Sequence, residues 1–192
     1  MTISAAEAGE AMAAIAATLD RHGIVEPEGF SVLSRLAREL KLKKDAVCWS
    51  VEVDRGAPIL FKRTTDEKSR GVKPRIVAKG IEIKQGDGVV LPFNTLDIAL
   101  EVHDDTSSPL SRWHLDLANK IDGVHQSGPL THLQFGGHYH NERERDHPLK
   151  VPRWCHPPME VALLCEVVAA NFYEENWLEL REEANWCQAI SL

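Results

Sequence analysis

The stretch "THLQFGGHYHNERERDH", from Thr131 to His147, contains four histidines, and a further histidine, His114, lies upstream. Imidazole changes its charge near neutral pH, so histidines can transfer protons, and neutral imidazole is a common metal ligand. Three interpretations follow. The histidines form an acid–base pair, they hold a metal, or they are simply hydrogen-bonded or solvated on a half-exposed strand and in a loop.

Two short segments of this region have the same pattern, "HLDL" at 114–117 and "HLQF" at 132–135. Alternate side chains of a strand share a face, so the polar and apolar residues of each segment lie on opposite faces. If the segments pair as a hairpin through "NKIDGVHQSG", one surface carries His114, Asp116, His132 and Gln134. A shift of one residue in the register would separate these side chains.

Two histidine-bearing strand segments that face each other resemble the arrangement in 2H phosphoesterases. In that family the third position of each segment is a serine or threonine, whereas this sequence has Asp116 and Gln134 there. The resemblance covers only these few residues. It implies acid–base cleavage of a phosphoester, in RNA or in a nucleotide.

The hydrolase hypothesis assigns a role to each polar side chain of this region. His132 is the general base, which accepts a proton, and His114 or His138 is the general acid, which donates one. These two roles need two imidazoles in different protonation states. Asp116 and Gln134 contact the ligand. Arg143 or Arg153 neutralises the phosphate.

The segment "HYHNERE" offers a metal site, since His138, His140 and Glu144 have the spacing H-x-H-x-x-x-E. This spacing resembles the first metal motif of cupins, although no second motif follows it. The resemblance implies a divalent transition metal as cofactor, such as Fe, Mn, Ni or Zn. A site outside the cupin pattern could also include His114, Asp116 or His132.

The terminal helices raise a different class of function. Trp177, Leu180, Ala184 and Cys187 follow helical spacing, which predicts either a face packed on a sheet or an exposed patch that contacts a partner. Cys155 comes just before Pro157 and Pro158 and is either an unreactive loop thiol or an activated nucleophile.

Composition and net charge argue against indiscriminate binding to nucleic acid or membrane surfaces. The chain has 192 residues, a net charge of −7 and 43% hydrophobic residues, which is typical of a globular protein that does not bind nucleic acid or membrane indiscriminately. Four cysteines without a C-x-x-C pair indicate reduced thiols, so we expect a cytoplasmic location. No uncharged apolar run approaches the roughly 18 residues needed to span a bilayer, so we expect no membrane association. Residues 62–84 are locally basic, which leaves nucleic acid or nucleotide binding open, and residues 160–192 are acidic.

The order of helical and strand patterns predicts an α+β fold, with a central, mostly antiparallel sheet flanked by N-terminal and C-terminal helices. We expect one domain over 1–192, with N-terminal helices at 4–42, a β-rich region at 46–140 and C-terminal helices at 158–190. Within these regions, capping and spacing predict helices at 4–22 and 29–42, and a break near 171–176.

The sequence therefore favours a non-catalytic binding or regulatory protein that contacts another protein, or a second copy of itself, through its terminal helices and charged faces. The alternative is a small histidine-dependent hydrolase or phosphodiesterase, with or without a metal. These hypotheses differ in whether at least two imidazoles converge on one substrate.

Overall fold

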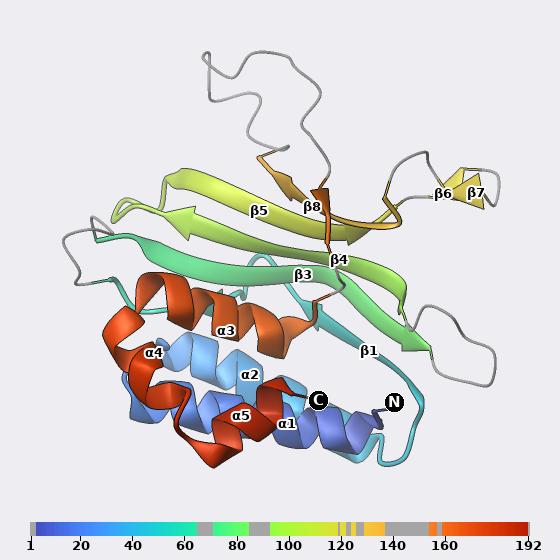
Figure 1. Cartoon of the computed structure of the whole chain (residues 1–192), viewed down its shortest axis with the longest axis horizontal. Coiled ribbons are helices and arrows are strands. Elements are labelled where there is room, and N and C mark those ends of the chain that lie inside the picture. The colour runs from blue at the N-terminus through green and yellow to red at the C-terminus, as the bar shows by residue number, and fades with distance from the viewer. Residues whose placement is uncertain are drawn as a thin grey trace.

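A computed structural model describes residues 3–64, 71–84, 93–118, 120–121, 124–125, 129–136, 154–156 and 159–191. Within these ranges the chain forms five helices and a seven-stranded antiparallel sheet, which confirms the predicted α+β fold. Figure 1 shows the helices grouped on one side of the sheet, and β5 and β8 lie farthest from them.

The two N-terminal helices form where the sequence predicts them. Helix α1 spans Ala5–Arg21, and Ser4 and Glu7 cap its start by exchanging side-chain and backbone hydrogen bonds. Helix α2 spans Pro27–Leu42, and its proline occupies the first turn, where no backbone N–H is needed. The apolar faces of both helices are buried in the core.

The main sheet has the strand order β1-β3-β4-β5-β8-β9, and β2 pairs with β3 beside this path. Its strands are β1 (Cys48–Val53), β2 (Ile59–Leu60), β3 (Lys73–Lys84), β4 (Phe93–His103), β5 (Pro109–Leu117), β8 (Thr131–Phe135) and β9 (Trp154–Cys155). Two short strands, β6 (Lys120–Ile121) and β7 (Val124–His125), pair only with each other. Strand β9 lies beyond the β-rich region predicted at 46–140. It was not predicted, because a two-residue strand is too short to show alternation.

The two faces of the sheet carry different side chains. On the helix-side face, Ile76, Ile98 and Leu115 belong to the hydrophobic core. Helix α2 lies against β1 and β2, and α3 (Val161–Phe172) lies against β3 and β4. The opposite face, which we call the outer face, carries the polar side chains of β3, β4, β5 and β8. This face positions the histidines that the sequence analysis selected.

Three helices form the C-terminal region, α3, α4 (Glu174–Leu180) and α5 (Ala184–Ile190). The first break, at Tyr173, lies inside the predicted range of 171–176, whereas the second break, between α4 and α5, was not predicted. The indoles of Trp177 and Trp186 both donate to the Glu166 carboxylate at 2.6 Å, and Trp186 is fully buried. Trp186 therefore faces the protein interior, whereas Trp177 is half-buried and packs against the core. No helix of the described residues is long and apolar enough to cross a membrane.

Candidate functional site

The register of β5 and β8 brings four of the predicted residues to one surface. Asp116 pairs with His132, and His114 pairs with Gln134, in an antiparallel ladder. Directly paired residues of neighbouring strands share a face, so all four side chains lie on the outer face. The shared surface, which the sequence predicted only for one register of the two strands, is therefore present. It does not by itself assign a chemical role to any of them.

A chain of acidic and imidazole groups crosses the outer face from β4 to β8. Nε2 of His114 lies 2.8 Å from Oδ1 of Asp97, and its Nδ1 lies 3.6 Å from Oδ2 of Asp116. Nε2 of His132 lies 2.6 Å from Oδ1 of Asp116, outside the angular range of a hydrogen bond. The hydrogen bond from His114 outweighs burial and, with the charges of Lys79 and Arg112, holds the pKa of Asp97 below its ordinary value.

Both ring nitrogens of each imidazole face oxygen atoms of the protein. Those of His114 face two carboxylates, and Nδ1 of His132 lies 3.3 Å from the carbonyl oxygen of Pro129. His132 is 1% exposed. A general acid or base needs a nitrogen within hydrogen-bonding distance of the substrate proton. In this conformation the two histidines are instead held by neighbouring groups.

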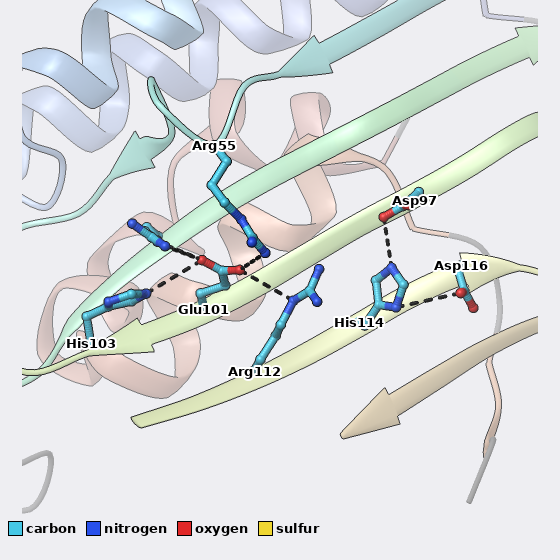
Figure 2. Close-up of polar contacts among 8 residues, drawn as sticks. Arg55, Asp97, Glu101, His103, Arg112, His114 and Asp116 are labelled. Carbon is cyan, nitrogen blue, oxygen red and sulfur yellow. Dashed lines mark hydrogen bonds and ion pairs between the residues drawn. The ribbon is translucent and has the colours of Figure 1, made fainter. Parts of the chain in front are cut away.

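A second polar cluster lies on the same face and was not predicted from the sequence. Figure 2 shows the Glu101 carboxylate, from β4, surrounded by cationic side chains. Arg75 donates to Oε2 from Nε at 2.7 Å, and Nη2 of Arg55 donates to Oε1 at 2.9 Å. Nε of Arg112 lies 3.4 Å from Oε1, and Nε2 of His103 lies 3.5 Å from Oε2. Each carboxylate oxygen therefore contacts two basic side chains.

Glu101 is 0% exposed, which makes this cluster a buried ionic network. Burial opposes its ionisation, but the hydrogen bond from Arg75 and the charges of Arg75, Arg55 and Arg112 outweigh burial and hold the pKa of Glu101 below its ordinary value. A buried carboxylate with several cationic partners stays charged, and removing it would leave those cations without compensation. The sequence signal was the shared strand face of Asp97, Glu101 and His103, but the arginines that contact Glu101 come from other strands and from the turn that holds Arg55.

The remaining predicted site residues lie outside the described residues. These are the three proposed metal ligands and the two arginines assigned to phosphate, His138, His140, Glu144, Arg143 and Arg153. Among the residues that the structure describes, no group of three or more histidine, cysteine, aspartate or glutamate side chains could hold a metal ion.

Cys155 lies in a strand, whereas the sequence analysis treated it as a loop residue. It pairs with His132 across β8 and β9, so the two residues share the outer face. The thiol is exposed, and none of the four cysteines forms a disulfide. Two of the arginines in the basic stretch at 62–84 are used internally, since Arg75 binds Glu101 and Arg63 donates to Asp105 at 2.8 Å.

The helix-side face holds an apolar recess that the sequence did not reveal. It has a volume of about 320 Å³ and lies between α3 and the strands β4, β5 and β8. Its walls include Trp113, Leu133, Val167 and Phe172, with the polar residues His156 and Asn171, among others.

Two large apolar side chains lie exposed on the same face, at the β8–β9 end of the sheet. Phe135 pairs with Trp113, which lines the recess, and Trp154 pairs with Leu133, which also lines it. Phe135 is 52% exposed and Trp154 is 71% exposed, although both are aromatic. We call Trp113, Leu133, Phe135 and Trp154, with the adjoining recess, the β8 surface.

We compared the chain with protein-family models, with curated proteins and with solved structures, and none of the three comparisons found a match.

Proposed function

We propose that the protein is a non-catalytic binding protein, and that its β8 surface holds an apolar segment of another protein. The observation that carries this proposal is the exposure of Phe135 and Trp154 beside an apolar recess of about 320 Å³. Contiguous exposed apolar side chains are unusual on a monomeric protein and are typical of interaction sites. Aromatic residues supply much of the binding energy at such sites.

The charge around the recess favours a partner segment with basic flanks. Helix α3 ends at Phe172, a residue of the recess, and α4 begins two residues later with the exposed residues Glu174 and Glu175. In the described residues of the C-terminal region, seven glutamates accompany one basic side chain, Arg181. Exposed glutamates next to an apolar recess attract a segment in which lysine or arginine flanks apolar side chains, and they repel acidic segments.

This proposal keeps the acidic terminal helices of the sequence hypothesis but moves the apolar contact to β8 and β9. The tryptophans at 177 and 186 are hydrogen-bonded to Glu166, which makes them poor candidates for a docking patch. In the proposal the protein acts in the cytoplasm, where the free thiols of Cys48 and Cys155 stay reduced.

The hydrolase hypothesis receives less support from the geometry. It needs an imidazole that can exchange a proton with a substrate, and the nitrogens of His114 and His132 face Asp97, Asp116 and a carbonyl oxygen. We therefore favour binding over catalysis.

The test measures the affinity of a fluorescent peptide whose apolar core is flanked by lysines. Fluorescence anisotropy compares the wild type with Trp154→Ser and Phe135→Ser. Leu42→Ser is the matched control, because Leu42 is an apolar residue of α2 that is 75% exposed and does not line the recess. We expect each aromatic variant to bind at least about 10-fold more weakly, as for a hot-spot residue, and the control to bind like the wild type.

A peptide with the same core and glutamate flanks should bind more weakly than the lysine-flanked peptide. The proposal fails if the lysine-flanked peptide does not bind, or if Leu42→Ser weakens it as much as Trp154→Ser does. Sedimentation of the free protein provides a further check. Self-association that Trp154→Ser abolishes would identify a second copy, and not a different protein, as the occupant.

A further inference from the structure

A second cavity lies between the helices and the sheet, beside the first turn of α3. It has a volume of about 260 Å³ and is bordered by α1, the start of α3, α5 and the strands β1, β3 and β4. Its wall is apolar, with residues such as Met12, Trp49 and Ile83, except at one position. That position is Glu160, whose carboxyl group is the only ionisable group among the residues that line the cavity.

Glu160 caps helix α3 from inside this apolar environment. The backbone amides of Ala162 and Leu163 donate to its two carboxyl oxygens at 2.8 Å and 2.9 Å. Among the described residues, no lysine, arginine or histidine forms an ion pair with it. Burial raises the pKa of Glu160, although the two hydrogen bonds oppose this effect. Within the described part of the chain, the carboxylate form therefore lacks a counter-charge.

Glu160 caps α3 with both carboxyl oxygens, although glutamate is not among the residues favoured for this role. The residues favoured for capping are serine, threonine, aspartate and asparagine, and Ser4 performs this function for α1. A ligand that brings a positive charge would supply the missing partner, since a desolvated carboxylate is stabilised by a nearby cation. An uncharged ligand would leave the negative charge of the carboxylate uncompensated.

The cavity has room for such a ligand and a route to solvent. An apolar cavity of about 150 Å³ is enough to bind benzene, so this larger cavity can hold a ring with a short side chain. Ile3, Phe93 and Glu160 are half-buried and not fully buried, so the wall of the cavity reaches the surface at these residues.

We propose that this cavity binds a small apolar molecule with one protonated amine, whose ammonium group pairs with the Glu160 carboxylate while its apolar body fills the cavity. The site is separate from the β8 surface, because the cavity and the recess share no lining residue. The protein then has a small-molecule site in addition to its partner surface.

The test uses isothermal titration calorimetry of the full chain with phenethylamine and with phenethyl alcohol, which have similar shape and differ in charge. We expect the amine to bind at least about 10-fold more tightly than the alcohol, the equivalent of one ion pair. In Glu160→Gln, whose amide oxygen can still cap the helix, the amine should lose this advantage and the alcohol should bind as before. Glu174→Gln removes the same charge from an exposed position and should change neither affinity.

Three results would overturn the proposal: no binding of the amine, equal affinities of the two compounds for the wild type, or unchanged amine binding in Glu160→Gln. If Glu160→Gln does not fold, the comparison of amine and alcohol with the wild type still decides the outcome.

Discussion

On the helix-side face of the sheet, Ile98 and Leu115 pack against apolar side chains, whereas on the outer face Glu101, Arg112 and His132 are buried to a similar extent. On the outer face, the buried polar side chains pair with groups of opposite charge. On the helix-side face, the buried residues pack against apolar side chains, but only as far as α3 extends over β3 and β4. Beyond α3, Phe135 and Trp154 remain exposed.

This difference separates two kinds of unusual residue. The buried charges of the outer face have partners within the protein, so their presence is explained by the fold itself. The aromatics of the β8 surface stay exposed among the described residues, even though the ring of Phe135 contacts that of Trp113 at a centroid distance of 5.5 Å. We therefore assign binding to the β8 surface and a mainly structural role to the outer face.

The largest expected effect is on the outer face. Glu101→Ala should lower the free energy of unfolding by about 3–5 kcal/mol, because it removes the Glu101 charge from beside the buried Arg112 and the half-buried Arg75. Urea denaturation measures this change. Glu52→Ala is the matched control, since Glu52 is an exposed glutamate of β1, and it should change stability by at most about 0.5 kcal/mol. Equal effects of the two substitutions would show that the Glu101 network contributes nothing.

A smaller loss is expected at the other end of the outer face. Asp97→Asn should cost about 1.5–3 kcal/mol, the contribution of a hydrogen bond to a charged group, because it weakens the contact with His114. Thermal unfolding followed by circular dichroism measures it. A variant as stable as the wild type would mean that His114 does not depend on Asp97 for its position.

Acid should destabilise the protein through these same carboxylates. The pKa values of Asp97 and Glu101 are lowered in the folded state, so both groups stabilise the protein at pH values above their unfolded pKa. This contribution is lost as the pH falls through the folded pKa values, starting below about pH 5. Urea denaturation between neutral and acidic pH should therefore show a smaller pH dependence for Asp97→Asn than for the wild type. An identical pH dependence would contradict the assignment.

The smallest effect on stability is expected at the β8 surface. Trp154→Ser should change the free energy of unfolding by at most about 0.5 kcal/mol, because the side chain is mostly exposed. The same urea titration detects this difference. A loss of several kcal/mol would mean that Trp154 belongs to the core and is not available to a partner.

Much of the fold was predictable because its signals are local. The capping residues Ser4 and Glu7 and the periodicity of α1 and α2 lie within single turns of helix. The shared face of His114, Asp116, His132 and Gln134 followed from alternation, and only the register needed the structure. Strand β9 gave no signal, because two residues cannot establish a period.

The Glu101 network and the β8 surface could not be predicted, because both depend on contacts between distant segments. Arg55, Arg75 and Arg112 reach Glu101 from three different parts of the chain. The exposure of Trp154 depends on how far α3 extends over the sheet, and no sequence pattern encodes this extent. The histidine face was therefore predictable from the sequence, whereas the β8 surface was not.

The most direct test of binding against catalysis compares His132→Gln with Trp154→Ser in two assays. One assay measures binding of the lysine-flanked peptide, and the other measures hydrolysis of bis-para-nitrophenyl phosphate. Our account predicts that Trp154→Ser weakens peptide binding, that folded His132→Gln binds like the wild type, and that no form hydrolyses the phosphodiester. Hydrolysis by the wild type that is lost in His132→Gln, with peptide binding unaffected by Trp154→Ser, would contradict it.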